Sequence, residues 1–237
     1  MIRVAIYWTP ENDSALARTA ARWLGRDSHN LECPDWVWPA SFDESRFREI
    51  IAAPFHYGFH GTIKPPFRLR DGFSLADVAD RLETFTHCRP EFTLPPFKVS
   101  RIGNFFCLRP LFPCKELTEL AADTVEHFDC FQKRAEYDEL QKRRSAGLSP
   151  RQEILLLRWG SPYVMDEFRF HLTLTGNVEN RREREILREE LSERFYPIGK
   201  EITFSSLCLF IEESGRPLRL VKRFSLSAEL QTSVTAQ

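Results

Sequence analysis

The sequence predicts an α+β fold with two pseudo-symmetric lobes, whose antiparallel sheets face a central cleft and carry helices on the outside. Runs of alternating apolar residues, typical of strands with one buried face, are interleaved with amphipathic helical runs. The order of these runs in the first half of the chain also recurs in the second half, as in a duplicated unit. The 237 residues are 42% hydrophobic and include 20 phenylalanines, enough for the core of one such domain.

The first half contains a full set of these runs. A helix at about 14–25 has an apolar stripe ending at Leu24 and a stop at Gly25. The predicted elements, in order, are a strand at 2–8, that helix, a short helix near 43–52, a strand from 55 to 64 ended by Pro65 and Pro66, a helix starting at Leu75 after the N-cap Ser74, and strands at 91–102 and 104–112.

The second half repeats this order. Shifting the first half by 111 residues, the separation of His60 and His171, brings each element within a few residues of a counterpart. The counterparts are a helix near 116–131, a strand at 167–176, a helix at 181–195, and strands at 201–211 and 217–226. We therefore place one lobe at about 1–110 and the other at about 111–230. Residues 132–166 have no counterpart and form a basic helical insertion, which either folds over the cleft or is a solvated helical hairpin.

Two strands carry polar side chains on one face. In EFRFHLTLTG the apolar residues share one parity, and in FHYGFHGTIKPPF the same alternation recurs. Gly61 stands where an apolar residue is expected, which indicates a close approach of the backbone. The polar parity of these two strands holds His56, His60, Thr62 and Lys64 in the first and Arg169, His171, Thr173 and Thr175 in the second.

The repeated His-x-Thr pattern suits phosphoryl chemistry. Residues i and i+2 of a strand lie roughly 6–7 Å apart on one face, so a phosphoryl group fits between the imidazole and the hydroxyl. Histidine titrates near neutral pH, so His60 and His171 can serve as base for the entering oxygen and acid for the leaving one. Thr62 and Thr173 would bind the phosphate, and Lys64 and Arg169 would neutralise the developing charge. This scheme needs no metal ion and no cofactor.

Four further residues are candidate substrate contacts. Thr175 extends the row of hydroxyls, and Tyr57 and Tyr163 flank the motifs, where they either stack on a base or sugar or pack in the core. Arg143 reaches a phosphate if the insertion closes and is otherwise solvated. His56 and His60 do not form a predicted metal pair, because on one strand they would lie roughly 13 Å apart.

Composition limits the partners and the compartment. The net charge of −1 provides no general attraction for DNA or for acidic membranes, so a small phosphodiester substrate is the expected partner, ahead of RNA. Six cysteines without paired spacing predict reduced thiols. The chain enters a strand pattern at Ile2 rather than a signal peptide, and no apolar run approaches the roughly 20 residues of a membrane helix. We therefore expect a cytoplasmic protein.

The paired motifs in a duplicated α+β chain resemble the 2H phosphoesterase superfamily, named for its two histidines. The phrases YGFHGTIKPPF and FRFHLTLTG, with GLSPRQ and RWGSPYV between them, are most similar to a bacterial branch often found with phosphonate-utilisation genes. The resemblance covers nearly the whole chain. It implies a bilobal fold around a cleft, with His60 and His171 as the acid/base pair and Thr62 and Thr173 as phosphate ligands. The sequence departs from the pattern at Gly61, where relatives more often carry alanine.

We therefore expect a hydrolase that opens a cyclic phosphodiester of a small nucleotide or sugar without a metal, with a role in phosphonate catabolism implied by the resemblance. Two alternatives stay open. One is an RNA-end-processing enzyme with the same chemistry, in which the basic insertion contacts RNA. The other is a non-catalytic protein that binds a phosphate ligand.

Overall fold

The computed structural model describes residues 2–29, 32–33, 35–145, 147–196, 202–214 and 216–227. The α+β fold with antiparallel strand pairing is confirmed. Residue 201 and residues 228–230, which the predicted strands and second lobe include, lie outside the described residues. The strands are β1 (Ile2–Trp8), β2 (Gly61–Arg68), β3 (Phe92–Leu94), β4 (Phe97–Ile102), β5 (Phe105–Pro110), β6 (Leu172–Thr173), β7 (Ile202–Phe204), β8 (Ser206–Glu213) and β9 (Arg219–Ser225).

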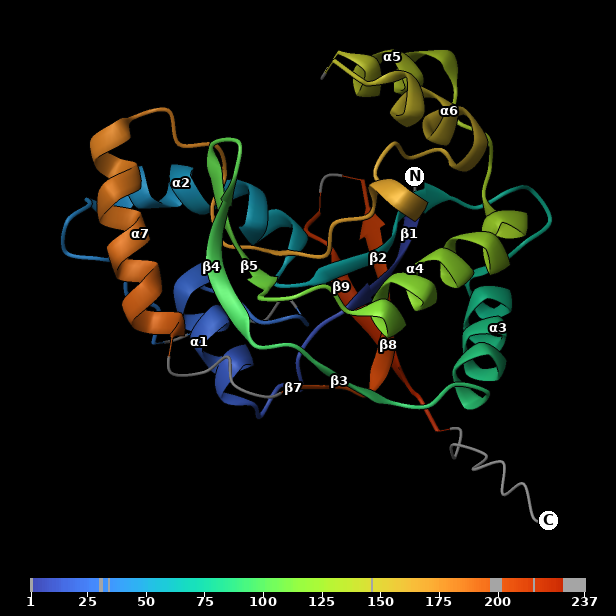
Figure 1. Cartoon of the computed structure of the whole chain (residues 1–237), viewed down its shortest axis with the longest axis horizontal. Helices are drawn as coiled ribbons and strands as arrows, with labels where there is room; N and C mark the ends of the chain where they lie inside the picture. Colours follow the sequence, from blue (N-terminus) through green and yellow to red (C-terminus); the bar gives the residue numbers. More distant parts are fainter. Residues whose placement is uncertain are drawn as a thin grey trace.

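The helices pack against the sheet and lie beyond its edges (Figure 1). α3 packs on β8 and β9, α4 packs on β2, and α7 packs on β4 and on α1. No helix among the described residues is long and apolar enough to cross a membrane. The helices are α1 (Ala15–Leu24), α2 (Glu44–Tyr57), α3 (Leu75–His87), α4 (Lys115–His127), α5 (Tyr137–Arg144), α6 (Pro150–Trp159) and α7 (Arg181–Phe195), with 3₁₀ turns η1 (Asp129–Phe131) and η2 (Met165–Glu167).

The two motif strands lie at the middle of the main sheet. Its seven strands have the order β4-β5-β6-β2-β1-β8-β9, and a separate ribbon pairs β3 with β7. β2 and β6 pair through Gly61 and Leu172 alone, whereas the neighbouring pairs are longer. The sheet therefore consists of two halves that meet along the motif strands.

Each half of the sheet contains a hairpin from the other half of the chain. The hairpin β8–β9 pairs with β1, and the hairpin β4–β5 pairs with β6. The predicted lobes, at about 1–110 and 111–230, require strands to pair within their own half of the chain. The observed pairing crosses that boundary instead. The duplicated order of elements could not reveal this exchange, because the same sequence pattern satisfies either pairing.

Local signals explain most element boundaries. Ser14 caps α1 by accepting a hydrogen bond from the amide of Ala17, and Gly25 ends the helix with a left-handed φ of 83°. α2 is longer than predicted and runs to Tyr57, so His56 lies on a helix and the alternation from residue 55 does not mark a strand. The alternation of aromatic residues and His56 over 55–57 is too short a window to separate the helical period from that of a strand.

The strand β2 continues through its two prolines, contrary to the prediction. Its register with β1 shifts twice, because Tyr7 opposes Thr62, Ile6 opposes Lys64 and Val4 opposes Phe67. Each shift places one extra residue on β2, which is the geometry of a β-bulge. The prolines lie in the second bulge, where a missing amide donor breaks no ladder hydrogen bond.

The insertion folds as two helices on the outer end of α4, with α5 and α6 at the edge of the molecule (Figure 1). A small core joins Leu155 of α6 to Val125 of α4 and to Val164. Ion pairs of 3.0 and 2.8 Å connect Arg68 at the end of β2 with Glu136 and Glu139. The helical character predicted for residues 132–166 is therefore present, and the insertion rests on β2 and α4.

Candidate active site

The two motif strands bring four side chains to one face of the sheet. Gly61 is the direct partner of Leu172, so the residues on either side of each project to the opposite face together. These neighbours are His60 and Thr62 on one strand and His171 and Thr173 on the other, all half-buried. The separate halves of the sequence thus supply matching groups within one strand spacing, about 4.8 Å.

Both imidazoles are oriented in the same way. Nδ1 of His60 lies 2.9 Å from the carbonyl oxygen of Gly58, and Nδ1 of His171 lies 2.7 Å from that of Arg169. A carbonyl oxygen only accepts, so Nδ1 carries the proton in both rings, and Nε2 of the neutral ring is the free base. Thr62 can then donate to Nε2 of His60 across 3.2 Å. Each histidine is fixed by the carbonyl two residues upstream, which repeats the motif's symmetry at the atomic level.

The surroundings favour the neutral form of both rings. Burial lowers the pKa of His60 to about 4, and the positive charges of His171 and Arg26 act in the same direction. Burial also lowers the pKa of His171, with a further contribution from the charge of Arg109. A hydrogen bond to a carbonyl opposes the shift in each case but does not cancel it.

A tyrosine from β1 supports the first histidine. The rings of Tyr7 and His60 are stacked, with centroids 3.8 Å apart and planes 14° from parallel. Tyr7 is itself buried, and this burial, together with the nearby Tyr57 and Glu212, raises the pKa of its phenol. Tyr7 was not predicted as a site residue. Tyr7 and Arg3 share one parity in the run that forms β1, and this parity indicates that both side chains lie on one face of the strand.

Two cations from the hairpin β4–β5 extend the polar face beyond His171. Leu108 pairs with Leu172, so the next residue along β5, Arg109, is next to His171 on the polar face. Lys98 is the direct partner of Arg109 on β4. Neither was predicted, because the hairpin was assigned to the other half of the fold, although the alternation within FKVSRI and FFCLRP gives their parity.

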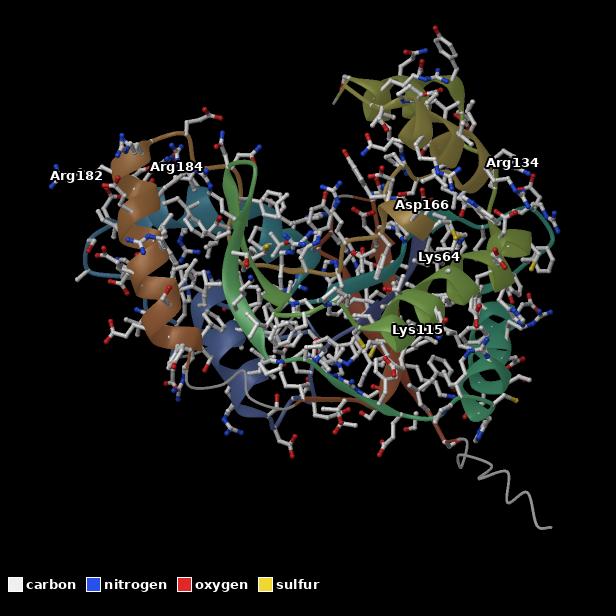
Figure 2. All side chains as sticks on the ribbon, in the orientation of Figure 1. Lys64, Lys115, Arg134, Asp166, Arg182 and Arg184 are labelled. Carbon is white, nitrogen blue, oxygen red and sulfur yellow. The ribbon has the colours of Figure 1, made fainter. Side chains whose placement is uncertain are left out.

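Lys64, a predicted phosphate ligand, lies elsewhere. The bulge between Thr62 and Lys64 turns its side chain to the helix-covered face, where it is 1% exposed. Its Nζ donates to the carbonyl oxygen of Val125 at 3.4 Å, and Figure 2 shows the residue beside α4. Burial lowers the pKa of this amine to about 8. The prediction failed because it counted parity across an irregular strand.

Thr175 and Arg143 also have structural partners. Thr175 is 0% exposed; its hydroxyl accepts from the amide of Phe106 and donates to the carbonyl of Gly176, both at 2.9 Å. It therefore does not extend the open row of hydroxyls. Arg143 of α5 donates to the carbonyl oxygen of Gly160, and burial lowers its pKa, as does the charge of Arg3. Arg3 is at the far end of β1 from Tyr7, roughly 13 Å along the strand.

The remaining candidates lie at the borders of the polar face. Arg169 is exposed on the segment before β6 and pairs with Glu167 at 3.4 Å. Tyr57 is exposed at the end of α2, close enough to Tyr7 to influence its pKa. Tyr163 is 50% exposed in the connection between α6 and η2, and no described contact links it to either histidine.

His56 has a separate role from His60. Its Nε2 lies 3.0 Å from a carboxylate oxygen of Glu212, which also binds Arg3. Within the described ranges, no three or more histidine, cysteine, aspartate or glutamate residues are grouped as metal ligands would be. The residues on the polar face are thus imidazoles, hydroxyls and cations.

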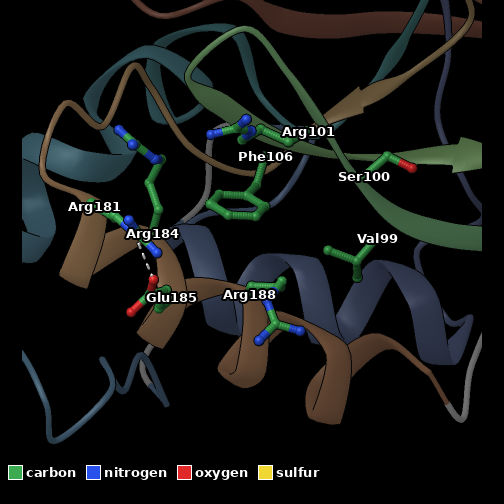
Figure 3. Close-up of a pocket in the computed structure, with 8 residues that line it drawn as sticks. All are labelled: Val99, Ser100, Arg101, Phe106, Arg181, Arg184, Glu185 and Arg188. Atoms are coloured by element: carbon green, nitrogen blue, oxygen red, sulfur yellow. Dashed lines mark hydrogen bonds and ion pairs between the residues drawn. The ribbon is translucent and has the colours of Figure 1, made fainter.

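A second cationic region lies on the other face of the hairpin. Phe106 of β5 faces a cavity of about 520 Å³ between β4 and α7, shown in Figure 3, where Arg181 and Glu185 form an ion pair of 3.0 Å. The arginines around it are Arg101, Arg181, Arg184 and Arg188. This cavity contains neither histidine. It is therefore distinct from the face that holds the His-x-Thr motifs.

The same fold occurs in solved structures. TT0787 of Thermus thermophilus superimposes with a TM-score of 0.50 over 96% of this chain and 99% of that chain, at 12% identity. A protein described as a phosphoesterase gives a TM-score of 0.47 at 15% identity, covering 95% of this chain and 98% of its own. The chain therefore has the α+β fold of TT0787, with its two motif strands side by side in the main sheet.

The particular family follows from the sequence comparisons. The chain belongs to the family described as "Protein of unknown function (DUF1045)", whose model matches residues 62–219. It is 36% identical over 175 residues to ribose 1,5-bisphosphate phosphokinase PhnN of Janthinobacterium sp. (strain Marseille), over 74% of this chain and 39% of the relative. The protein of that name from Laribacter hongkongensis (strain HLHK9) is 32% identical over 75% of this chain and 41% of its own length. The chain thus spans about two fifths of these relatives.

Proposed function

We propose that this protein is a phosphodiesterase that hydrolyses a cyclic phosphodiester by paired-histidine acid/base catalysis. The observation that carries the proposal is the matched orientation of His60 and His171, each with Nδ1 tied to a carbonyl and Nε2 left for proton transfer. Two such groups on adjacent strands suit a reaction that takes up one proton and delivers another.

We assign the role of base to His60 and that of acid to His171, because the charge of a protonated His171 contributes to lowering the pKa of His60. The pKa of His60 is lowered to about 4, so this ring is neutral at pH 7 and can accept a proton. In the hydrolysis, water attacks phosphorus, His60 takes the proton of the water, and the ring P–O bond breaks. His171 gives its proton to the departing alkoxide, which leaves a hydroxyl and a phosphate monoester. Thr62 and Thr173 would donate to the non-bridging oxygens as their charge grows.

A small substrate suits the surroundings better than RNA. Two arginines of the insertion form ion pairs within it, Arg144 with Glu153 and Arg151 with Asp166. The net charge of −1 provides no general attraction for a long polyanion. The names of the curated relatives favour a sugar phosphate, and through it a place in phosphonate catabolism, as the substrate class of this shorter chain.

The test is turnover by purified protein in EDTA with a panel of cyclic phosphates of sugars and nucleosides. We expect hydrolysis of at least one of them and its loss, by about 10²-fold or more, in both His60→Gln and His171→Gln. Circular dichroism of the variants checks that the fold persists. Full activity in both variants would contradict the assigned roles, and binding of a cyclic phosphate without turnover would favour the non-catalytic alternative.

A further inference from the structure

Two cations face each other across the hairpin beside the catalytic face. Lys98 and Arg109 are direct partners in the β4–β5 pairing, so their side chains share a face. Like charges in directly opposed positions destabilise a sheet. Among the residues described here, neither has an ion pair with a carboxylate that would relieve this repulsion. The hairpin therefore keeps two adjacent positive charges in an arrangement that an anion would stabilise.

This pair stands in one row with His171. The partner of Leu108 is Leu172, so Arg109 adjoins His171, and Lys98 lies one strand further out. Neighbouring strands are about 4.8 Å apart, which places the two cations roughly 5 and 10 Å from the motif strand. The charge of Arg109 acts on His171 strongly enough to contribute to the lowered pKa of that ring. The cations are therefore beside the reacting groups but outside the pair of His-x-Thr motifs.

A cavity opens at the same corner. It has a volume of about 340 Å³; Lys98, Arg109 and Arg169 contribute to its wall, whereas His60 and His171 do not, so it adjoins the motif face through Arg109. The start of α4 also borders it, and the N-cap Cys114 makes no capping hydrogen bond with its side chain. The positive end of the helix dipole therefore adds to the attraction for an anion. Arg169 already forms an ion pair with Glu167. Lys98 and Arg109 are therefore the principal side chains that would bind an anion here.

We propose that this corner binds a second phosphate of the substrate, one that is not cleaved. The substrate would then be a cyclic phosphodiester that also carries a phosphate monoester, with the two phosphorus atoms separated by one to two strand spacings, about 5–10 Å. A phosphorylated five-carbon sugar is of this size. The statement about substrate class rests on the proposed function, whereas the statement about phosphate binding does not.

The first experiment compares two substrates that differ only in the second phosphate. Adenosine 2′,3′-cyclic phosphate, with and without a 5′-phosphate, provides such a pair. We expect the 5′-phosphate to raise kcat/KM at least tenfold in the wild type, and the ratio between the two substrates to fall towards one in Lys98→Gln/Arg109→Gln, because two charged hydrogen bonds are lost. Arg101→Gln is the matched control: it removes a cation from the same strand on the other face and should leave the ratio unchanged.

The second experiment needs no turnover. Calorimetry should show ribose 5-phosphate binding to the wild type and to Arg101→Gln, and binding at least tenfold weaker to Lys98→Gln/Arg109→Gln. That result supports the second site even if no cyclic phosphate is hydrolysed, in which case only the proposed function fails. If cyclic phosphates are hydrolysed but the substrate ratio is unaffected by the double substitution, the second site is overturned and the proposed function stands. If inorganic phosphate binds as tightly as ribose 5-phosphate, the proposal that the second phosphate is carried by a sugar is overturned.

Discussion

The ring of Phe170 fills the space that a side chain at position 61 would need. A Cβ atom built on Gly61 would lie 2.2 Å from Cε2 of Phe170, far inside van der Waals contact. Phe170 also packs edge-on against Trp8, with ring centroids 6.0 Å apart. The two motif strands therefore meet through a glycine on one and an aromatic ring on the other, directly beneath the histidines.

Alanine at position 61, which the resemblance to the 2H superfamily led us to expect there, should therefore destabilise this protein. We expect Gly61→Ala to lower the free energy of unfolding by about 1–3 kcal/mol, as overpacking of a core does. Replacing Phe170 with leucine in the same chain should recover part of the loss, because the smaller side chain vacates the space. Urea unfolding of both single variants and the double variant measures this coupling, and strictly additive effects would contradict it.

Regular alternation made much of this site predictable. His60, Thr62, His171 and Thr173 lie where the predicted parity places them, although only Leu172–Thr173 of the strand predicted at 167–176 pairs as a strand and Glu167 belongs to a 3₁₀ turn. Parity failed one step later, at Lys64, because a bulge in β2 adds a residue and reverses the face. No residue of the strand signals that bulge; the two prolines lie in the second bulge, beyond Lys64, and were interpreted as the end of the strand.

Pairing between distant segments was the other limit. The period of a strand gives its two faces but not its neighbour, so the exchange of hairpins between the halves stayed hidden. Lys98 and Arg109 come next to His171 only through that exchange, and Tyr7 comes next to His60 through the pairing of β1 with β2. Helices were predicted more closely, α7 at its full length, because their caps and stripes are local.

Thr173 and Thr175 should respond oppositely to the same substitution. Thr173→Val removes a donor from the open face, so we expect turnover to fall about 10–10³-fold with little change in stability. Thr175→Val leaves the buried amide of Phe106 without its acceptor, so we expect about 1–3 kcal/mol lower stability and retained activity at a temperature where the protein stays folded. Each variant is the control for the other, in paired assays of turnover and urea unfolding. The reverse pattern would mean that Thr175 contacts the substrate.

Lys64→Met should leave catalysis intact, and the free energy of unfolding should vary less with pH in the alkaline range. The amine has a pKa of about 8 in the folded protein and about 10.4 when unfolded. Between these values the unfolded chain binds more protons, so the wild type gains stability as the pH rises from about 8 to about 10.4. The variant lacks this gain, and at neutral pH it should be equally or more stable, since no charge is buried. Unfolding curves at neutral pH and near pH 10 test this, and a large loss of turnover would return Lys64 to the site.

The two motif histidines should set the stability at acid pH and, in the proposed reaction, the rate. Each has a lowered pKa, so below about pH 6.5 the unfolded chain binds protons that the folded protein resists, and the free energy of unfolding should fall from about pH 6.5 towards pH 4. His60→Gln should flatten that decline.

As the pH rises, kcat/KM should increase above about pH 4, where His60 loses its proton, and decrease again before about pH 6.5, where His171 loses the proton that it must donate. Proton NMR titration of the two imidazole rings assigns each limb of the pH–rate profile to one histidine. A midpoint for His60 near its ordinary value of about 6.5 would remove the reason to make it the base, since His171, whose pKa is lowered, would then be the ring that loses its proton first.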